Sequence, residues 1–454
     1  MTKKITILKK AFLGLFISGT VTFNATAQQW DTVGVAGFSA GVSTFQNIEV
    51  YNDTLYTAYA DGTQANKVTV KKYDGTSWVT VGTDGFSAGS GTELDLEINS
   101  AGELYVVYED NANSNGITVM KYNGATWGIV GTANLANSQG QKPSLAFDAN
   151  DVPYVAFLSG ANIPNLEIVV NKFDGSNWVA VGGALVSINS TNYPNHANIA
   201  FDANNVPHVT YSASGTNIKR FDGTNWVSVG TSTVISAGEA TYQDLLFDAN
   251  GNANIAYRDH ANGGKTTVLN YSSNTWSTVG TAGFTAGGST YQKLGISSNG
   301  VLYVVQQDQN VTSHVSVYVY DGTSWMLLGG APAASGSKNY TDMVINDDVV
   351  YVIFQDGLNA SRAVVLNYNI GVAIDKIQAL NNSVTIYPNP VYDQLVIEGI
   401  DAIEAINILT IDGKLVKSVA STNNTVAISE VPQGVYWLQI RTAKGIAHKR
   451  FVKK

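Results

Sequence analysis

The sequence contains no cysteine, and only 13% of its 454 residues carry charge. Without disulfides, its stability must come from a large hydrophobic core. The net charge of −9 is spread thinly, and no basic patch with interleaved aromatic residues occurs, which argues against nucleic-acid binding. By contrast, glycine is abundant at 44 residues, and tyrosine, threonine, valine and asparagine are plentiful. This composition predicts an all-β protein with many short strands and tight turns.

The N-terminus has the three parts of a secretory signal peptide. Lysines at positions 3, 4, 9 and 10 precede a mostly apolar run over 11–21, and Ala25-Thr26-Ala27 supplies a small-residue cleavage site. The apolar run is too short to cross the roughly 30 Å of hydrocarbon in a bilayer, so it is not interpreted as a transmembrane helix. No other segment could span a membrane as a helix. We predict a signal peptide at 1–27, cleaved after Ala27, and an exported protein.

Seven tryptophans recur at nearly equal intervals along most of the chain. The gaps between them are 48, 49, 51, 48, 50 and 49 residues, and such a period is the signature of a repeat architecture. The tryptophans are Trp30, Trp78, Trp127, Trp178, Trp226, Trp276 and Trp325.

Each repeat contains four predicted strands. The tryptophan follows an Asp-Gly or related turn, as in YDGTSWVTVG at 73–82, where glycine reaches positive φ without steric cost. In the repeat at 79–127 we expect strands over 94–98, 103–109, 117–122 and 126–130. Four strands per repeat form the blade of a β-propeller.

The two ends of the repeat array are complementary. After Trp325 three strands are predicted, at 343–345, 350–354 and 363–368, and the fourth is missing. Residues 30–34 have a fourth-strand sequence with no three strands before them, so this N-terminal strand is expected to close the last blade. An open β-solenoid, the alternative, would not need a displaced strand. We therefore predict a seven-bladed β-propeller over 28–370. Its repeat resembles kelch and related propeller repeats in architecture only, because the kelch double glycine is absent.

A different pattern begins at residue 383, after a predicted linker at 371–382. Short alternating strands with an Asp-Gly hairpin turn predict a small C-terminal β-sandwich over 383–454. The motif residues are Tyr387, Pro388, Asn389, Pro390, Asp412, Gly413, Gly434 and Tyr436. With these motifs in order, the segment closely resembles the type A C-terminal sorting domain of type IX secretion in Bacteroidota.

This resemblance implies a cellular address. The tail would be recognised by the type IX secretion machinery and is usually removed, while the protein is attached to surface lipopolysaccharide or released. We therefore expect a protein that is secreted or attached to the outer cell surface, with no transmembrane span. A purely structural β-sandwich is the alternative.

A recurrent acid follows the second strand of five repeats, on the face where propellers commonly bind ligands. Its carboxylate could bind a cation or sugar hydroxyls, because both favour oxygen ligands. Alternatively, an aspartate at this position caps a turn by accepting backbone amides. No stretch matches a calcium loop, so no cofactor is assigned and calcium stays an unproven alternative. The residues are Asp61, Asp110, Asp259, Asp308 and Asp356.

A second polar column lies on the predicted inner strands, between apolar neighbours. We expect it to line the channel, either as a structural hydrogen-bond ring or as ligand contacts, with Asp95, Asp244 and Asp342 as the candidate ligand-binding members. The remaining members are Asn47, Ser144, Asn198 and Lys293. The tryptophans, whose faces could stack on sugars, are expected instead to pack neighbouring blades together.

No catalytic constellation stands out in the sequence. The five histidines are scattered, and no serine sits in a nucleophile elbow. We therefore expect no enzyme but a surface binding module for polysaccharide or another extracellular polymer. A glycan-cleaving hydrolase that uses the channel carboxylates is the first alternative. A structural or protein-adhesion protein is the second.

Overall fold

The computed structural model describes residues 29–454 apart from several short segments. The segments left out are 136–138, 161–165, 189–196, 233, 310–312, 337, 371–383, 401–402, 411–414, 420–423 and 443–444. The predicted signal peptide (1–27), the predicted linker (371–382) and the motif residues Asp412 and Gly413 lie outside the described residues. In the described part of the chain, no helix has both the length and the apolar character needed to cross a membrane.

Up to Asn369, the described chain forms seven antiparallel sheets. The first three are β2 (Ser43–Tyr51), β3 (Thr54–Asp61), β4 (Lys67–Tyr73) and β5 (Trp78–Thr80); β6 (Gly91–Ile98), β7 (Leu104–Asp110), β8 (Gly116–Tyr122) and β9 (Trp127–Ile129); and β10 (Gly140–Phe147), β11 (Pro153–Ser159), β12 (Leu166–Phe173) and β13 (Trp178–Ala180), with β14 (Val186–Ile188) paired to β12. The next three are β15 (Ala197–Phe201), β16 (Pro207–Ser212), β17 (Thr216–Phe221) and β18 (Trp226–Ser228); β19 (Ala240–Phe247), β20 (Ala253–Asp259), β21 (Lys265–Ser272) and β22 (Thr275–Thr278); and β23 (Ser289–Ile296), β24 (Leu302–Asp308), β25 (His314–Tyr320) and β26 (Trp325–Leu327). The seventh is β27 (Lys338–Asn346), β28 (Val349–Asp356), β29 (Arg362–Asn369) and β1 (Asp31–Thr32).

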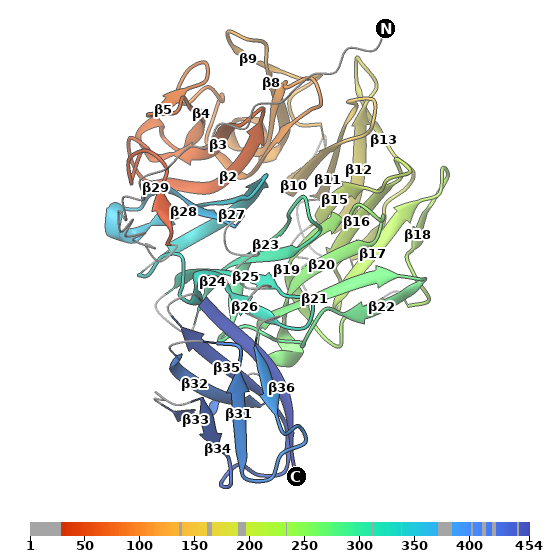
Figure 1. Cartoon of the computed structure of the whole chain (residues 1–454). Coiled ribbons are helices and arrows are strands. Elements are labelled where there is room, and N and C mark those ends of the chain that lie inside the picture. The colour runs from red at the N-terminus through yellow and green to blue at the C-terminus, as the bar shows by residue number, and fades with distance from the viewer. Residues whose placement is uncertain are drawn as a thin grey trace, which may run out of the picture.

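The sheets are arranged so that their first strands lie side by side (Figure 1). Contacts run from β2 through β6, β10, β15, β19 and β23 to β27, and β27 also contacts β2. The strand β1 comes from the start of the described chain, yet it pairs with β29, with Asp31 opposite Asn367 and Thr32 opposite Leu366. The seventh sheet therefore joins segments from the two ends of the repeat array.

The all-β prediction and the four-stranded antiparallel sheets are confirmed. The strands expected over 94–98, 103–109, 117–122 and 126–130 correspond to β6, β7, β8 and β9. The first strand of the sheet begins three residues earlier than expected, at Gly91. A bulge near its start interrupts the alternating pattern, so the sequence did not show that the strand begins there. The extra strand β14 was not expected from the sequence.

Tryptophan side chains connect neighbouring sheets. Six of them donate their Nε1–H to the carbonyl of a valine in the preceding repeat, at 2.8–3.1 Å, as Trp226 does to Val181. The glycine after that valine, Gly182, has a φ of +69°, and a Cβ there would lie 3.3 Å from the Trp226 ring. Each valine-glycine pair thus forms a close seat for the next tryptophan, whose hydrogen bond contributes about 1 kcal/mol. This geometry agrees with the expected packing role.

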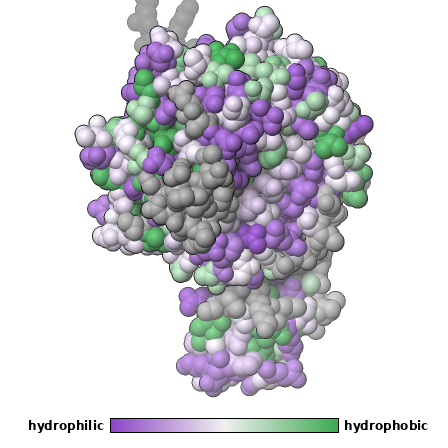
Figure 2. Space-filling model, turned by 180° about the vertical axis from the view of Figure 1, so that it is seen from behind, coloured by the Kyte–Doolittle hydropathy of each residue, from purple (hydrophilic) through white to green (hydrophobic). Residues whose placement is uncertain are grey.

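Beyond residue 383, two further sheets enclose a separate core of buried aliphatic residues. One contains β30 (Thr385–Tyr387), β31 (Gln394–Glu398) and β34 (Thr425–Ala427). The other contains β33 (Leu415–Val419), β32 (Ile403–Thr410), β35 (Gly434–Thr442) and β36 (Gly445–Lys453), paired in that order. Seen from behind, most of the coloured surface is hydrophilic, and hydrophobic residues occur in small separate patches (Figure 2).

Candidate functional site

The turn aspartates cap short helices. Asp61, Asp110, Asp259 and Asp356 each accept the backbone N–H two residues ahead, at 2.9–3.1 Å. The 3₁₀-helices that they begin are η1 (Gly62–Gln64), η2 (Asn111–Asn113), η3 (His260–Asn262) and η5 (Gly357–Asn359), while η4 (Leu328–Gly330) follows β26. Asp308 is buried at the end of β24. Asp61, Asp110, Asp259 and Asp356 therefore have the geometry of the turn-capping alternative, and we do not carry the five aspartates forward as ligand contacts.

Five members of the channel column each link their first strand to the next one. Asp95 accepts the N–H of Leu145 at 2.9 Å, and Asp342 accepts the N–H of Ile48 at 2.9 Å. Asp244 accepts the N–H of Leu294 at 2.7 Å. Ser144 and Asn198 accept equivalent amides at 3.3 and 3.2 Å. The structure thus brings the three predicted aspartates together and gives one oxygen of each a structural partner.

Lys293 breaks the pattern of this column because an ammonium group cannot accept an amide. Instead, its Nζ lies 3.4 Å from Oδ1 of Asp244, which also accepts a hydrogen bond from Asn198 at 3.2 Å. The charge of Asp244 raises the pKa of Lys293 well above its ordinary value, so the lysine stays charged. Asp95 and Asp342 form no ion pair within the described residues.

A second ring of side chains lies at the mouth of the channel, and the sequence analysis missed it. In six first strands the register shifts at a bulge. Each of these strands also carries one residue with φ between +46° and +54° at that point. A bulge re-aims a side chain out of the strand's alternation. The bulge residues are Phe45, Glu93, Lys142, Tyr242, Tyr291 and Tyr340. Apart from the step of 100 residues between Lys142 and Tyr242, their spacing of 48 or 49 residues was the available signal.

Four of these residues form a continuous run of rings, the aromatic arc, defined as Phe45, Tyr340, Tyr291 and Tyr242. Successive ring centroids lie 4.8, 5.2 and 5.2 Å apart, with interplanar angles of 52–57°. Each ring is half-buried. The two other bulge residues form an ion pair, with Lys142 Nζ 3.4 Å from Glu93 Oε1. The mouth is therefore aromatic on one side and charged on the other.

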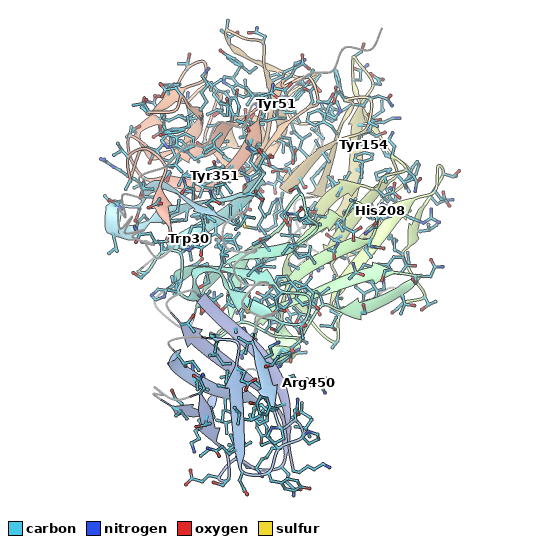
Figure 3. The ribbon with its side chains drawn as sticks, in the orientation of Figure 1. Trp30, Tyr51, Tyr154, His208, Tyr351 and Arg450 are labelled. Atoms are coloured by element: carbon cyan, nitrogen blue, oxygen red, sulfur yellow. The ribbon has the colours of Figure 1, made fainter. Side chains whose placement is uncertain are left out.

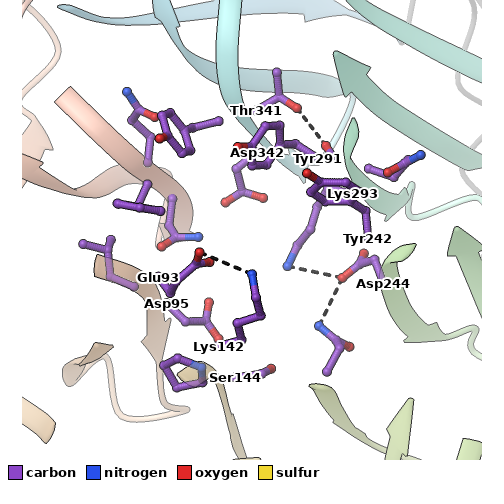
Figure 4. Close-up of a pocket in the computed structure, with 18 of the residues that line it drawn as sticks. Glu93, Asp95, Lys142, Ser144, Tyr242, Asp244, Tyr291, Lys293, Thr341 and Asp342 are labelled. Carbon is purple, nitrogen blue, oxygen red and sulfur yellow. Dashed lines mark hydrogen bonds and ion pairs between the residues drawn. The ribbon is translucent and has the colours of Figure 1, made fainter. Parts of the chain in front are cut away.

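The two rings enclose a cavity of about 160 Å³. Its lining comes from all seven first strands and includes both the bulge residues and the channel column. Figure 4 shows the side chains of Asp342, Lys293, Lys142 and Glu93 converging on one opening. Asn47 also lines this cavity, and its buried Oδ1 has no hydrogen-bond partner among the described residues.

Carboxylates crowd the channel. Desolvation raises the pKa of Asp95 to about 6, although Lys293 and the Leu145 amide act in the opposite direction. On the first strand β2, two residues after Asn47, burial and the charge of Asp342 raise the pKa of Glu49 to about 8. Burial and the charge of Glu49 raise the pKa of Glu97 well above its ordinary value. The channel thus combines protonated and ionised carboxyl groups near neutral pH.

Stability should fall as the pH rises from about 4.5 to about 8. The folded state retains a proton on Glu49 that the unfolded chain releases, so the free energy of unfolding decreases by up to about 1.4 kcal/mol per pH unit for one such group. Urea unfolding at several pH values should show this slope, and Glu49→Gln should flatten it. Glu103→Gln is the control, because Lys121 holds the pKa of Glu103 below its ordinary value. An unchanged slope in Glu49→Gln would contradict the assignment.

The described residues contain no group of three or more histidine or acidic side chains placed to hold a metal ion. We therefore assign no metal to the channel.

Three motif residues of the C-terminal segment, Tyr387, Asn389 and Gly434, make close contacts within it. Asn389 donates its Nδ2 to the carbonyl of Arg450 at 3.0 Å and accepts the N–H of Val452 at 2.9 Å, so its amide pairs with β36 as a strand would. Tyr387 donates to Glu398. A Cβ on Gly434 would lie 3.2 Å from the ring of Tyr436. Arg450 lies on the sheet of this segment (Figure 3).

Comparison with known families decides what this segment is. Residues 385–454 match the family described as a secretion system C-terminal sorting domain. The tail is a type IX sorting domain. The sorting domain indicates that the protein is secreted and attached to the cell surface, and it implies an interaction with the secretion machinery. The prediction from the sequence is confirmed in both respects.

Among solved structures, the chain is similar to several proteins of low sequence identity. PorZ from Porphyromonas gingivalis, described as an essential bacterial surface component of the type IX secretion system, is 15% identical, with a TM-score of 0.47 over 90% of this chain and 59% of PorZ. A polysaccharide lyase described as an ulvan lyase is 12% identical, with a TM-score of 0.51 over 74% of this chain and 96% of the lyase. A puromycin-hydrolyzing peptidase from Mycobacterium tuberculosis is 11% identical, with a TM-score of 0.50 over 76% of this chain and 55% of the peptidase. No curated protein matches the chain.

The likeness to the polysaccharide lyase supports a propeller-like fold and corrects one expectation. The expectation that the chain is not an enzyme is contradicted, because a polysaccharide lyase has the same kind of fold. The error was to treat a repeated scaffold without a known motif as evidence against catalysis. A fold of this kind carries its chemistry in side chains that no short motif records.

Proposed function

We propose that the chain is an exported enzyme that hydrolyses a glycan at the mouth of the channel. Asp95 and Asp342 would be the reacting carboxylates. The observation that carries the proposal is that both line one cavity, beneath an aromatic arc, and form no ion pair within the described part of the chain. The fold shared with a polysaccharide lyase supports a glycan as the substrate class.

The two carboxyl groups suit a division of labour. Glycoside hydrolysis needs one carboxylic acid to protonate the leaving oxygen and one carboxylate to activate water or attack the sugar. The pKa of about 6 lets Asp95 hold a proton in mildly acidic solution and donate it. Asp342 accepts the amide of Ile48, which orients its carboxylate, and would supply the second role.

Hydrolysis fits the charges better than elimination. Elimination from a uronic acid polymer needs a cation that is free to neutralise the sugar carboxylate and a base that removes the neighbouring proton. The two lysines that line the cavity, Lys142 and Lys293, lie beside the carboxylates of Glu93 and Asp244. Among the described lining residues, no cation is left to bind the substrate carboxylate.

We further propose that the scaffold is a closed ring of seven four-stranded blades over 28–370. The chain of contacts from β2 to β27 and back, and the pairing of β1 with β29, support this closure. The proposed organisation is a signal peptide at 1–27, the propeller, a linker at 371–382 and the sorting domain from 383 to 454. The proposed partner, besides the secretion machinery, is an extracellular glycan.

A cleavage assay tests this function. The purified protein is incubated with neutral polysaccharides (β-glucan, xylan, arabinan and galactan) and acidic ones (polygalacturonate and alginate). We expect new reducing ends from at least one neutral polymer, without the ultraviolet-absorbing unsaturated ends that elimination leaves. Unsaturated ends would show that the protein cleaves by elimination and not by hydrolysis. An absence of cleavage across the whole panel would contradict the proposal.

A further inference from the structure

The aromatic arc lines the cavity from four neighbouring first strands. Its four rings come from β2, β19, β23 and β27, at bulges where non-glycine residues adopt positive φ. Bulky residues occupy that region rarely, and such backbone is typical of sites where a side chain must be re-aimed. The result is a set of half-buried aromatic faces on one side of the cavity mouth.

The size of the cavity limits what these rings can hold. At about 160 Å³, it is smaller than the roughly 300–1,000 Å³ of pockets that enclose drug-sized ligands. It therefore suits one sugar ring and not a run of several. The end of a glycan chain can place a single ring in such a cavity without bringing further rings with it, so the end of the chain is the part that we consider.

The charges around the cavity limit the ligand further. Its described lining contains four carboxylates and two lysines, an excess of two negative charges when all are ionised. The lining carboxylates are Glu93, Asp95, Asp244 and Asp342. An anionic sugar would be repelled and would find both lysines already paired. The amide oxygen of Asn47 has no partner in the described part of the chain, so it can accept the proton of a hydroxyl group.

We propose that the aromatic arc and Asn47 form a subsite that holds one uncharged terminal sugar ring of a glycan. The proposal rests on the proposed function and deepens it, because it names a neutral substrate that is bound by its end. The apolar face of the sugar packs on Tyr291 and its neighbours, and the hydroxyl groups face Asn47 and the ion pair of Glu93 with Lys142. Cleavage at this position removes sugars from the chain end.

Binding measurements test the subsite separately from the reaction. Calorimetric titration uses the full protein with Asp95→Asn, so that ligands are not consumed. The probes are neutral di- and hexasaccharides from the four neutral polymers and the hexasaccharide of galacturonic acid. Tyr291→Ala should weaken binding of the best neutral probe about 10-fold, while Tyr291→Phe, which keeps the ring, should stay within about 3-fold. Tyr51→Ala, at the far end of β2 (Figure 3), is the matched control and should bind normally.

The outcomes separate the subsite from the function. Affinity that is nearly equal for di- and hexasaccharide supports a single-ring subsite, whereas a climb of more than about 10-fold with length overturns it. Tighter binding of the acidic probe, unchanged binding in Tyr291→Ala, or no binding of any probe would also overturn it. Binding that follows these expectations without cleavage by the wild-type protein would keep the subsite and reject the hydrolase. Cleavage by the wild-type protein that is unchanged in Tyr291→Ala would keep the hydrolase and reject the subsite.

Discussion

Asp95→Asn is expected to lower the rate of reducing-end release by a factor on the order of 10²–10⁴, the usual contribution of a positioned acid or base. The substitution removes the proton that the group with a pKa of about 6 would donate. It should leave the scaffold intact, because Asn198 occupies the equivalent position of another sheet and accepts the same kind of backbone amide, that of Leu245. Asp342→Asn should lower the rate of reducing-end release by a similar factor, because it removes the second carboxylate.

The controls for this experiment come from the same protein. Asp74→Asn alters an exposed turn carboxylate that accepts the amides of Thr76 and Ser77, and it should retain full activity. Thermal unfolding of each variant would verify that the fold is kept. Full activity in both Asp95→Asn and Asp342→Asn would remove these carboxylates from the reaction, whatever the protein cleaves.

Deletion of residues 381–454 should abolish delivery to the cell surface. The sorting domain at 385–454 carries the address, and the seven sheets before it have no part in its core. The measurement is surface labelling of intact cells with an antibody to the N-terminal part, compared with the amount retained in the periplasm. We expect at least about a 10-fold loss of surface signal, with the retained protein still folded.

A single substitution tests which part of the sorting domain surface delivery requires. Asn389→Ala removes the two hydrogen bonds that join this residue to β36, and it should impair delivery if the docked geometry of Tyr387 to Pro390 is recognised. Lys417→Ala, on the partly exposed strand β33, is the control. Undiminished surface delivery of the deleted protein would contradict the role of the domain in this chain.

The fold was predictable because its strongest signals are periodic. The tryptophan interval marked each repeat, and the turn at Asp74-Gly75 marked the hairpin before the tryptophan, since the same side chain closes the turn. The start of β6 was predicted less well. A bulge interrupts the alternation of apolar and polar residues from which strands are recognised, so the pattern begins only after it.

The candidate site was only half predictable, for a related reason. The column of Asp95, Asp244 and Asp342 stood out as polar residues between apolar neighbours. Tyr291 and Tyr340 did not, because a tyrosine near the start of a strand is indistinguishable from a core residue until the backbone turns it outward. The turn aspartates were visible but ambiguous, since a cap and a ligand contact use the same oxygen atoms.

The pairing of β1 with β29 also sets an order of events during synthesis. The two strands are separated by about 330 residues, so the seventh sheet cannot be completed until nearly all of the repeat array has been made. Until then, β29 or its incoming partner exposes an unpaired edge to other chains in the periplasm. The strand that leaves the ribosome first is therefore among the last to find its place, and the interval before it does is when the protein most needs protection from aggregation.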